Sequence, residues 1–268
     1  LYTSDGRDIE MSVASTKAFY SQIVAGHLLA LCFAQLLLSR RDSFIADELA
    51  VLEQALELMG QVLLQKEKIR QAAEQFAKRK PYWAVVGSGP NKAAADEIRI
   101  KLSELCYKTI STDVVENKKH IDLSAEPLIV VCAAGNPEAV MGDIAKDVAI
   151  FKAHKAAVVV FADSGEGRFD GLADAVIPIP WARLPLPVIL NTVAGHLLGY
   201  YAALSIDEDA QFLKEYRSRL NRIMVEQDKR GASVYDRIAD REFRRLIRDF
   251  SAQFHQRRNS GDFSFTSV

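Results

Sequence analysis

The sequence predicts an α/β protein, a three-layer α/β/α sandwich with a mostly parallel sheet, preceded by long connector helices. Two observations support this fold class. After Pro81, short and continuously apolar runs alternate with segments of helical periodicity, which is typical of a parallel sheet covered on both faces. The 268 residues are 49% hydrophobic and 26% charged, which provides enough apolar surface for one large or two modest cores.

Two helical segments open the chain. From Lys17 to about Ser39 the apolar residues follow a 3.6-residue period, and small residues make much of the other face apolar too, so we expect a buried helix. Polar side chains spread through it disfavour a membrane span. A longer helix is expected from Phe44 to Lys80, ending before Pro81. Both helices are interpreted as a connector.

The sheet and its covering helices come next. We expect strands at residues 83–86, 128–131, 158–161 and 175–179, and helices at 92–108, 138–154 and 187–204. Parallel sheets of this kind bind ligands at the carboxyl ends of their strands. Residues 207–258 contain 13 Lys or Arg and 10 Asp or Glu, with apolar residues at helical spacing, and predict one or two amphipathic helices. The last ten residues predict a loose tail.

The charge balance limits the partners. Lys and Arg total 34 against 35 Asp and Glu, which disfavours nucleic acid and anionic membranes as partners. Cys32, Cys106 and Cys132 lie within apolar runs, which favours reduced core thiols and a cytoplasmic location. The first twelve residues have neither a signal core nor an Arg-rich amphipathic pattern, and we expect that an upstream part precedes them.

A short glycine turn is the first candidate for chemistry. Gly87-Ser88-Gly89 follows a strand and precedes a helix, where backbone N–H groups can hold a phosphate. The turn is equally compatible with glycines that only relieve backbone strain. A dinucleotide fingerprint would need a third glycine where Lys92 stands, so a nicotinamide cofactor is disfavoured.

Three charged residues share one face of the following helix. Glu97, Lys101 and Glu104 are spaced i, i+4 and i+7, and Lys108 extends the stripe. Spacing alone favours a solvated face with alternating salt bridges. The functional alternative is a carboxylate that acts as a general base beside a cation that stabilises an enediolate.

Two further segments are candidates. His120 ends the polar stretch of residues 116–120, and a loop histidine can exchange protons near neutral pH. Ser15 and Thr16 lead into the first helix, where a hydroxyl is either an ordinary N-cap or a contact for a sugar phosphate. The other histidines suggest core, interface or helix-end positions and no metal site.

Taken together, these segments resemble the isomerase half of the glutamine-dependent fructose-6-phosphate amidotransferases (glucosamine-6-phosphate synthases), a pair of sugar isomerase (SIS) domains. The segment EMSVASTKAFYSQ, residues 10–22, resembles the family pattern E-x-G-V-A-S-T-K-A-F-T-x-Q. The charged helix matches E-x-x-x-K-L-x-E, and Lys119 and His120 match two positions of a G-E-L-K-H-G loop. The resemblance covers about residues 8 to 206.

The resemblance implies a division of the chain and roles for single residues. Residues 1–80 would be the end of a first SIS domain with connector helices, 81–206 a second SIS domain, and 207–268 a charged helical extension. Glu104 would move a proton between C1 and C2 of the sugar, with Glu97 and Lys101 beside it. His120 would assist ring opening in the site of a neighbouring subunit, and Val13 and Ser15 would line the sugar site.

The expected activity is therefore ketose to aldose isomerisation through an enediol, coupled to amination at C2, without cofactor or metal. The implied partners are a sugar phosphate, a second subunit in a homodimer, and upstream SIS and glutaminase domains. Three departures from the family limit this expectation. The Ser- and Thr-rich phosphate loops would lie upstream, residues 133–138 lack the serines of a second cradle, and the L-A-K-S-V tail with its lysine is absent.

Lys214 is a lysine downstream of that point, but no family motif assigns it the role of the missing tail lysine. The alternative function is a sugar-phosphate-sensing or assembly module that has kept the SIS scaffold and lost turnover.

Overall fold

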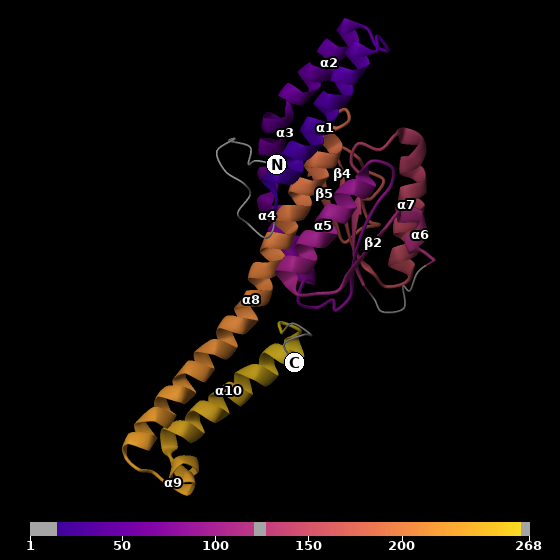
Figure 1. Ribbon diagram of the computed structural model, residues 1–268. Coiled ribbons are helices and arrows are strands. Elements are labelled where there is room, and N and C mark those ends of the chain that lie inside the picture. Colours follow the sequence, from indigo (N-terminus) through magenta and orange to yellow (C-terminus); the bar gives the residue numbers. More distant parts are fainter. Residues whose placement is uncertain (1–14, 121–126, 264–268) are drawn as a thin grey trace.

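The computed structural model describes residues 15–120 and 127–263 and confirms the predicted fold class (Figure 1). Its centre is a parallel sheet of five strands in the order β2-β1-β3-β4-β5. The strands are β1 (Trp83–Gly87), β2 (Ile110–Asp113), β3 (Leu128–Cys132), β4 (Ala157–Asp163) and β5 (Ala175–Ile179). The sequence pattern predicted all of these except β2.

Helices cover both faces of the sheet because each central strand is apolar on both sides. In β1, Trp83 and Val85 face one core while Ala84 and Val86 face the other. The first core is closed by α3 (Ala55–Leu63), α4 (Lys66–Phe76), α5 (Asn91–Cys106) and the first half of α8 (Leu186–Lys229). The second is closed by α6 (Val115–Lys118) and α7 (Glu138–Ala153).

The N-terminal helices differ from the expectation. The predicted helix 44–80 is divided into α2 (Asp42–Glu53), α3 and α4. In α1 (Lys17–Leu36) only Ala18 and Leu31 are buried, so the expectation of a buried helix is wrong for this chain by itself. Cys106 and Cys132 are buried as expected, and burial raises the pKa of the Cys106 thiol to about 12. Cys32, on α1, is exposed.

Two helices, α1 and α8, are long and apolar enough to cross a membrane by length and composition alone. Most of the apolar window of α8 is buried inside the domain, where it serves as a core helix, whereas almost none of the window of α1 is buried. Tyr20, Ile23 and Val24 of α1 pack against the main core, whereas apolar residues farther along the helix, such as Leu29, Phe33 and Leu36, are exposed.

The C-terminal part forms an arm that projects from the domain (Figure 1). Helix α8 continues without a break beyond the predicted end at Leu204 and reaches Lys229, a length of about 66 Å at 1.5 Å per residue. After α9 (Val234–Ala239), α10 (Arg241–Ser260) folds back along it. Aromatic and aliphatic side chains join the two helices in a separate core: Phe212, Tyr216, Ile223, Leu246 and Phe263, with Phe243, Phe250 and Phe254 beside them.

Candidate functional site

The predicted cluster on α5 is assembled around a buried lysine. The Nζ atom of Lys101 lies 3.1 Å from Oε2 of Glu104 and 3.6 Å from Oε1 of Glu97. The side chain of Lys101 is 5% exposed, that of Glu97 is 11% exposed and that of Glu104 is 33% exposed. The solvated face favoured by spacing alone is therefore wrong for Lys101 and Glu97. Glu104 is the member that solvent, or a substrate, can reach.

Lys108 does not extend this cluster. Helix α5 ends at Cys106, and Tyr107 takes a left-handed conformation with φ of 53°, which turns the chain away. The Lys108 ammonium donates hydrogen bonds to the carbonyls of Ala77 and Lys80, at 3.0 Å each, and lies over the ring of Trp83. Burial lowers its pKa. Its contacts fasten the end of α4 to the sheet.

Two residues that sequence reasoning did not place in the site continue the cluster. His196, on α8, has Nε2 at 3.4 Å from Oε1 of Glu97 and Nδ1 at 2.6 Å from the hydroxyl of Tyr20 on α1. The histidine side chain is 10% exposed. Burial, followed by the charge of Glu97, raises the pKa of Tyr20, so its hydroxyl stays protonated. A polar path thus runs through three helices from Tyr20 to Glu104.

A cavity of about 280 Å³ adjoins this path. It is lined by the N-cap residue Thr16, by Tyr20 of α1 and by His196 of α8, together with four apolar residues, Met59, Leu63, Val193 and Leu197. Thr16 is the N-cap residue of α1 but makes no side-chain cap hydrogen bond, and Ser15 precedes it. The ordinary N-cap alternative therefore does not account for Thr16. Val13, the other predicted sugar contact, lies outside the described residues.

The glycine turn before α5 has a structural reason. A Cβ atom on Gly87 would lie 2.3 Å from the backbone oxygen of Asn91, so only glycine permits the tight entry into the helix. The N–H groups of Asn91 and Lys92 donate to the carbonyls of Ser88 and Gly89. These contacts account for the turn without a phosphate.

The turn after β3 already holds an anion from the chain itself. The Asp163 carboxylate accepts hydrogen bonds from the N–H of Gly135, at 3.0 and 3.1 Å. Burial raises the pKa of Asp163, and the bond from Gly135 opposes that shift. A Cβ on Gly135 would lie 2.3 Å from Cβ of Pro187, so α8 closes the other side. A phosphate at this turn would therefore be blocked by the Asp163 carboxylate on one side and by α8 on the other.

His120 is not brought to the cluster within one chain. It is exposed, directly after α6, and its N–H donates to the carbonyl of Asn117 at 2.9 Å. Helix α6 packs on α7, on the face of the sheet opposite α5. The neighbouring Lys119 is held by Asp147, 3.0 Å away, which raises the pKa of that lysine. The geometry of one chain therefore separates His120 from Glu104.

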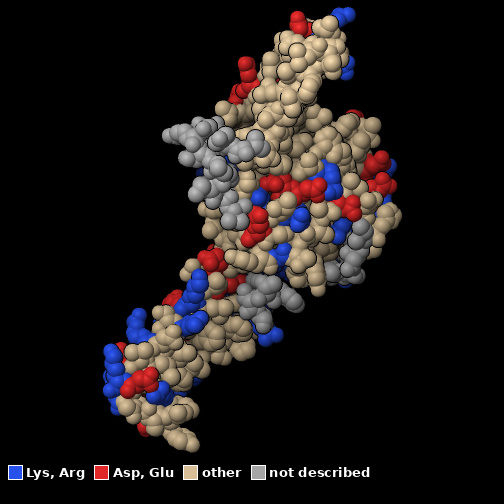
Figure 2. All heavy atoms as spheres, viewed as in Figure 1, with Lys and Arg blue, Asp and Glu red and all other residues tan. Residues whose placement is uncertain are grey.

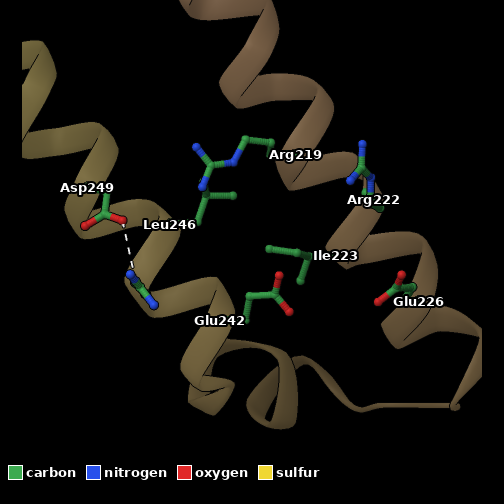
Figure 3. Close-up of a pocket in the computed structure, with 8 residues that line it drawn as sticks. Arg219, Arg222, Ile223, Glu226, Glu242, Leu246 and Asp249 are labelled. Carbon is green, nitrogen blue, oxygen red and sulfur yellow. Dashed lines mark ion pairs between the residues drawn. The ribbon is translucent and has the colours of Figure 1, made fainter.

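Charged side chains of both signs gather on the domain face that carries α5 and again along the arm (Figure 2). In the arm they surround a hollow between α8 and α10 (Figure 3). Its lining is Arg219, Arg222, Ile223, Glu226, Glu242, Arg245, Leu246 and Asp249, with Arg245 and Asp249 3.8 Å apart. Three arginines are balanced by three carboxylates, so this hollow has no net preference for an anion. Lys214 also belongs to the arm, away from Lys101.

Tyr20 and His196 were missed because their contact joins residues 176 positions apart in the sequence. The sequence interpretation placed His196 within an apolar helix as a core or interface residue, and it is indeed largely buried. No local sequence pattern marks this pairing, because the buried histidine and the buried carboxylate meet only when α8 packs on α5.

Comparisons with known proteins agree on one relationship. No protein-family model matches the chain. The glutamine–fructose-6-phosphate aminotransferase (isomerizing) of Methanosarcina acetivorans is 30% identical over 222 residues, which are 80% of this chain and 35% of that protein. The enzyme of the same name from Pseudomonas syringae is 31% identical over 197 residues, 73% of this chain and 32% of that protein. The chain thus spans about a third of the length of these relatives.

Solved structures give the same fold. The C-terminal domain of glucosamine-fructose-6-phosphate aminotransferase from Francisella tularensis superposes with a TM-score of 0.64 at 26% identity, covering 71% of this chain and 54% of that one. A tagatose-6-phosphate ketose/aldose isomerase assigned in Clostridium novyi superposes with a TM-score of 0.53 at 14% identity, covering 71% and 49%. The second likeness concerns the fold alone.

Proposed function

This chain is a homologue of the C-terminal, isomerase part of the glutamine–fructose-6-phosphate aminotransferases, and from that relationship we propose that it carries ketose/aldose isomerisation of a sugar phosphate through an enediol. Glu104 is the base, Lys101 the electrostatic helper and His120 the acid and base of ring opening. Ser15 and Val13 contact the sugar, and Glu97 holds Lys101. The protein acts in the cytoplasm, and the reaction needs no cofactor or metal.

The observation that carries the proposal is the burial of Lys101 between two carboxylates, of which Glu104 is the more accessible. In the reaction the Glu104 carboxylate takes the proton from C1 of the open-chain ketose, and the electron pair of that C–H bond forms the C1–C2 double bond. The carbonyl oxygen at C2 then bears negative charge, which a nearby ammonium stabilises in a site shielded from water. A proton then passes from O1 to O2, and collapse of the O1 oxyanion to the C1 carbonyl, with return of the proton from Glu104 to C2, gives the aldose.

The rest of the site belongs to other parts of the assembly. We propose that an upstream SIS domain supplies the phosphate contacts, that a glutaminase domain supplies ammonia for amination at C2, and that two subunits form a homodimer. Two features support these assignments. The turn after β3 is occupied by the Asp163 carboxylate, and the segment from α1 to α3 exposes apolar side chains such as Leu36, Leu37 and Leu56.

The experiment compares Glu104→Gln with the wild type in the full-length protein. We expect fructose-6-phosphate isomerisation, with and without glutamine, to fall by roughly 10²–10⁴-fold, since that is the contribution of a positioned general base. Sugar-phosphate binding by calorimetry should be retained because the amide keeps the shape of the carboxylate. Glu74→Gln, an exposed residue of α4, is the matched control. Undiminished turnover in Glu104→Gln would reject Glu104 as the base.

A non-catalytic sensing or assembly module is the second candidate. It is favoured by the continuation of α8 through residues 205–229, where the family pattern has a short tail with a lysine. A wild-type protein that binds fructose-6-phosphate but never converts it would establish this candidate and reject all three catalytic roles.

A further inference from the structure

We propose that His196 is a positioning residue, anchored by Tyr20, that holds Glu97 and thereby keeps Lys101 on the base Glu104. The proposal rests on the proposed function, since it assigns the residues that orient the base of that reaction. It adds two residues, on α1 and α8, that the resemblance does not assign. The quoted pattern has threonine where this chain has Tyr20.

One oxygen of Glu97 is shared between two partners. Oε1 of Glu97 lies 3.4 Å from Nε2 of His196 and 3.6 Å from Nζ of Lys101. Neither Oε1 of Glu97 nor Nε2 of His196 has a hydrogen bond of good geometry within the described residues, although both atoms are buried. Catalytic contacts of this kind are often long without substrate and shorten in the bound complex. The imidazole and the ammonium therefore both lie within ion-pair distance of the same oxygen, and we expect these contacts to shorten when substrate binds.

The two neighbours of the His196 ring favour one tautomer of the imidazole. With the proton on Nε2, the imidazole donates toward the Glu97 carboxylate and accepts the hydroxyl proton of Tyr20 at Nδ1. In the opposite tautomer the Nδ1–H can donate to the Tyr20 oxygen, but the lone pair of Nε2 then faces the Glu97 carboxylate. The Nε2–H tautomer is the one that directs a donor toward the Glu97 carboxylate and an acceptor toward the Tyr20 hydroxyl.

Loss of the His196 donor would change the position of Lys101. Without His196, the Glu97 carboxylate is free to rotate fully onto Lys101. The ammonium then moves from its 3.1 Å contact with Glu104 toward Glu97, because both partners are on the same helix. Glu104 then loses the contact that orients it as the base, and the enediolate loses the stabilising charge of Lys101. Tyr20 fixes the ring in turn, and Thr16, one turn earlier, lines the same cavity.

The test compares His196→Leu, His196→Gln and Tyr20→Phe in the full-length protein. Glutamine places an amide N–H where Nε2 stands, whereas leucine has no donor. We expect His196→Leu to lower kcat by roughly 10–100-fold, as small misplacements of catalytic groups do, with KM for fructose-6-phosphate within about twofold. His196→Gln should retain most of the wild-type kcat, and the kcat of Tyr20→Phe should lie between those of His196→Leu and His196→Gln. Thermal unfolding of each variant excludes loss of the fold.

The matched controls are exposed residues of the same types. His154→Leu at the end of α7 and Tyr200→Phe on α8 should leave kcat unchanged. A kcat for His196→Leu equal to that of the control, in a folded protein, would overturn the proposal. So would equal losses in the leucine and glutamine variants, because packing alone would then explain them.

A readout that does not depend on turnover separates this proposal from the proposed function. Nitrogen-15 NMR of the wild type should show the neutral Nε2–H tautomer of His196, and Tyr20→Phe should shift the Nδ1 resonance. If the wild type isomerises nothing, the proposed function fails, but the observed tautomer still tests whether Tyr20 anchors the His196 ring. A ring with its proton on Nδ1 would overturn the assignment.

Discussion

Gly195 shows how a single residue sets the approach of the two helices that form the site. A Cβ atom at this position would lie 2.3 Å from Cγ1 of Ile98 on α5. We therefore predict that Gly195→Ala lowers the free energy of unfolding by about 1–3 kcal/mol, the usual cost of overpacking a core. Urea unfolding measures the change.

Gly142 provides the control for that substitution. It lies on α7 with open space around its Cβ position, so Gly142→Ala should raise stability by up to about 1 kcal/mol through helix propensity. Equal effects of the two substitutions would show that helix propensity, and not the contact between α5 and α8, determines the result at Gly195.

The α5 cluster shows how far residue patterns alone can predict a site. The spacing of Glu97, Lys101 and Glu104 placed them on one helical face, and the structure confirms that they are in contact. Periodicity did not give the burial of Lys101, because burial depends on α8 lying over α5. Pairing Tyr20 with His196 required the same long-range packing. Local patterns thus gave the cluster, and tertiary packing gave its environment.

Among the elements, the C-terminal arm depends on one aromatic cluster. Phe212 of α8 is buried, with its ring centroid 6.0 Å from that of Phe250 and 5.6 Å from that of Phe263. We predict that Phe212→Ala costs about 3–5 kcal/mol within the arm, as large-to-small changes in cores do. Hydrogen exchange of α10 should accelerate while that of β3 and β4 stays unchanged, because their cores are separate.

Tyr235→Ala is the control for the arm, since Tyr235 on α9 is 85% exposed. It should leave the exchange of α10 unaltered. If Phe212→Ala instead accelerated exchange throughout the sheet, the arm and the domain would be one cooperative unit, and the separation of their cores would have no energetic meaning.

Element boundaries show where sequence patterns lose information. Strand β2 escaped prediction because Ile110–Asp113 is short, polar and at the edge of the sheet, with no continuous apolar run. Helix α8 was predicted to end at Leu204, where the apolar pattern gives way to charge. No glycine or proline stands between Gly199 and Gly231, so the backbone stays helical as its surroundings change from core to arm.

At the scale of the whole molecule, the sheet separates two residues that the proposed reaction needs together. Glu104 lies on α5, which covers one face, and His120 follows α6, which covers the other. A site containing both residues therefore requires a second subunit that presents its His120. This requirement predicts that two inactive variants restore activity when mixed in one dimer.

The experiment co-expresses Glu104→Gln with His120→Asn in the full-length protein. Each variant alone should be nearly inactive. Random pairing gives half mixed dimers, in which one of the two sites combines an intact Glu104 with an intact His120 from the other subunit, so about a quarter of wild-type turnover should return. If His120 served the site of its own chain, every site of a mixed dimer would carry one substitution and no activity would return. The recovered fraction thus measures whether the site crosses the subunit boundary.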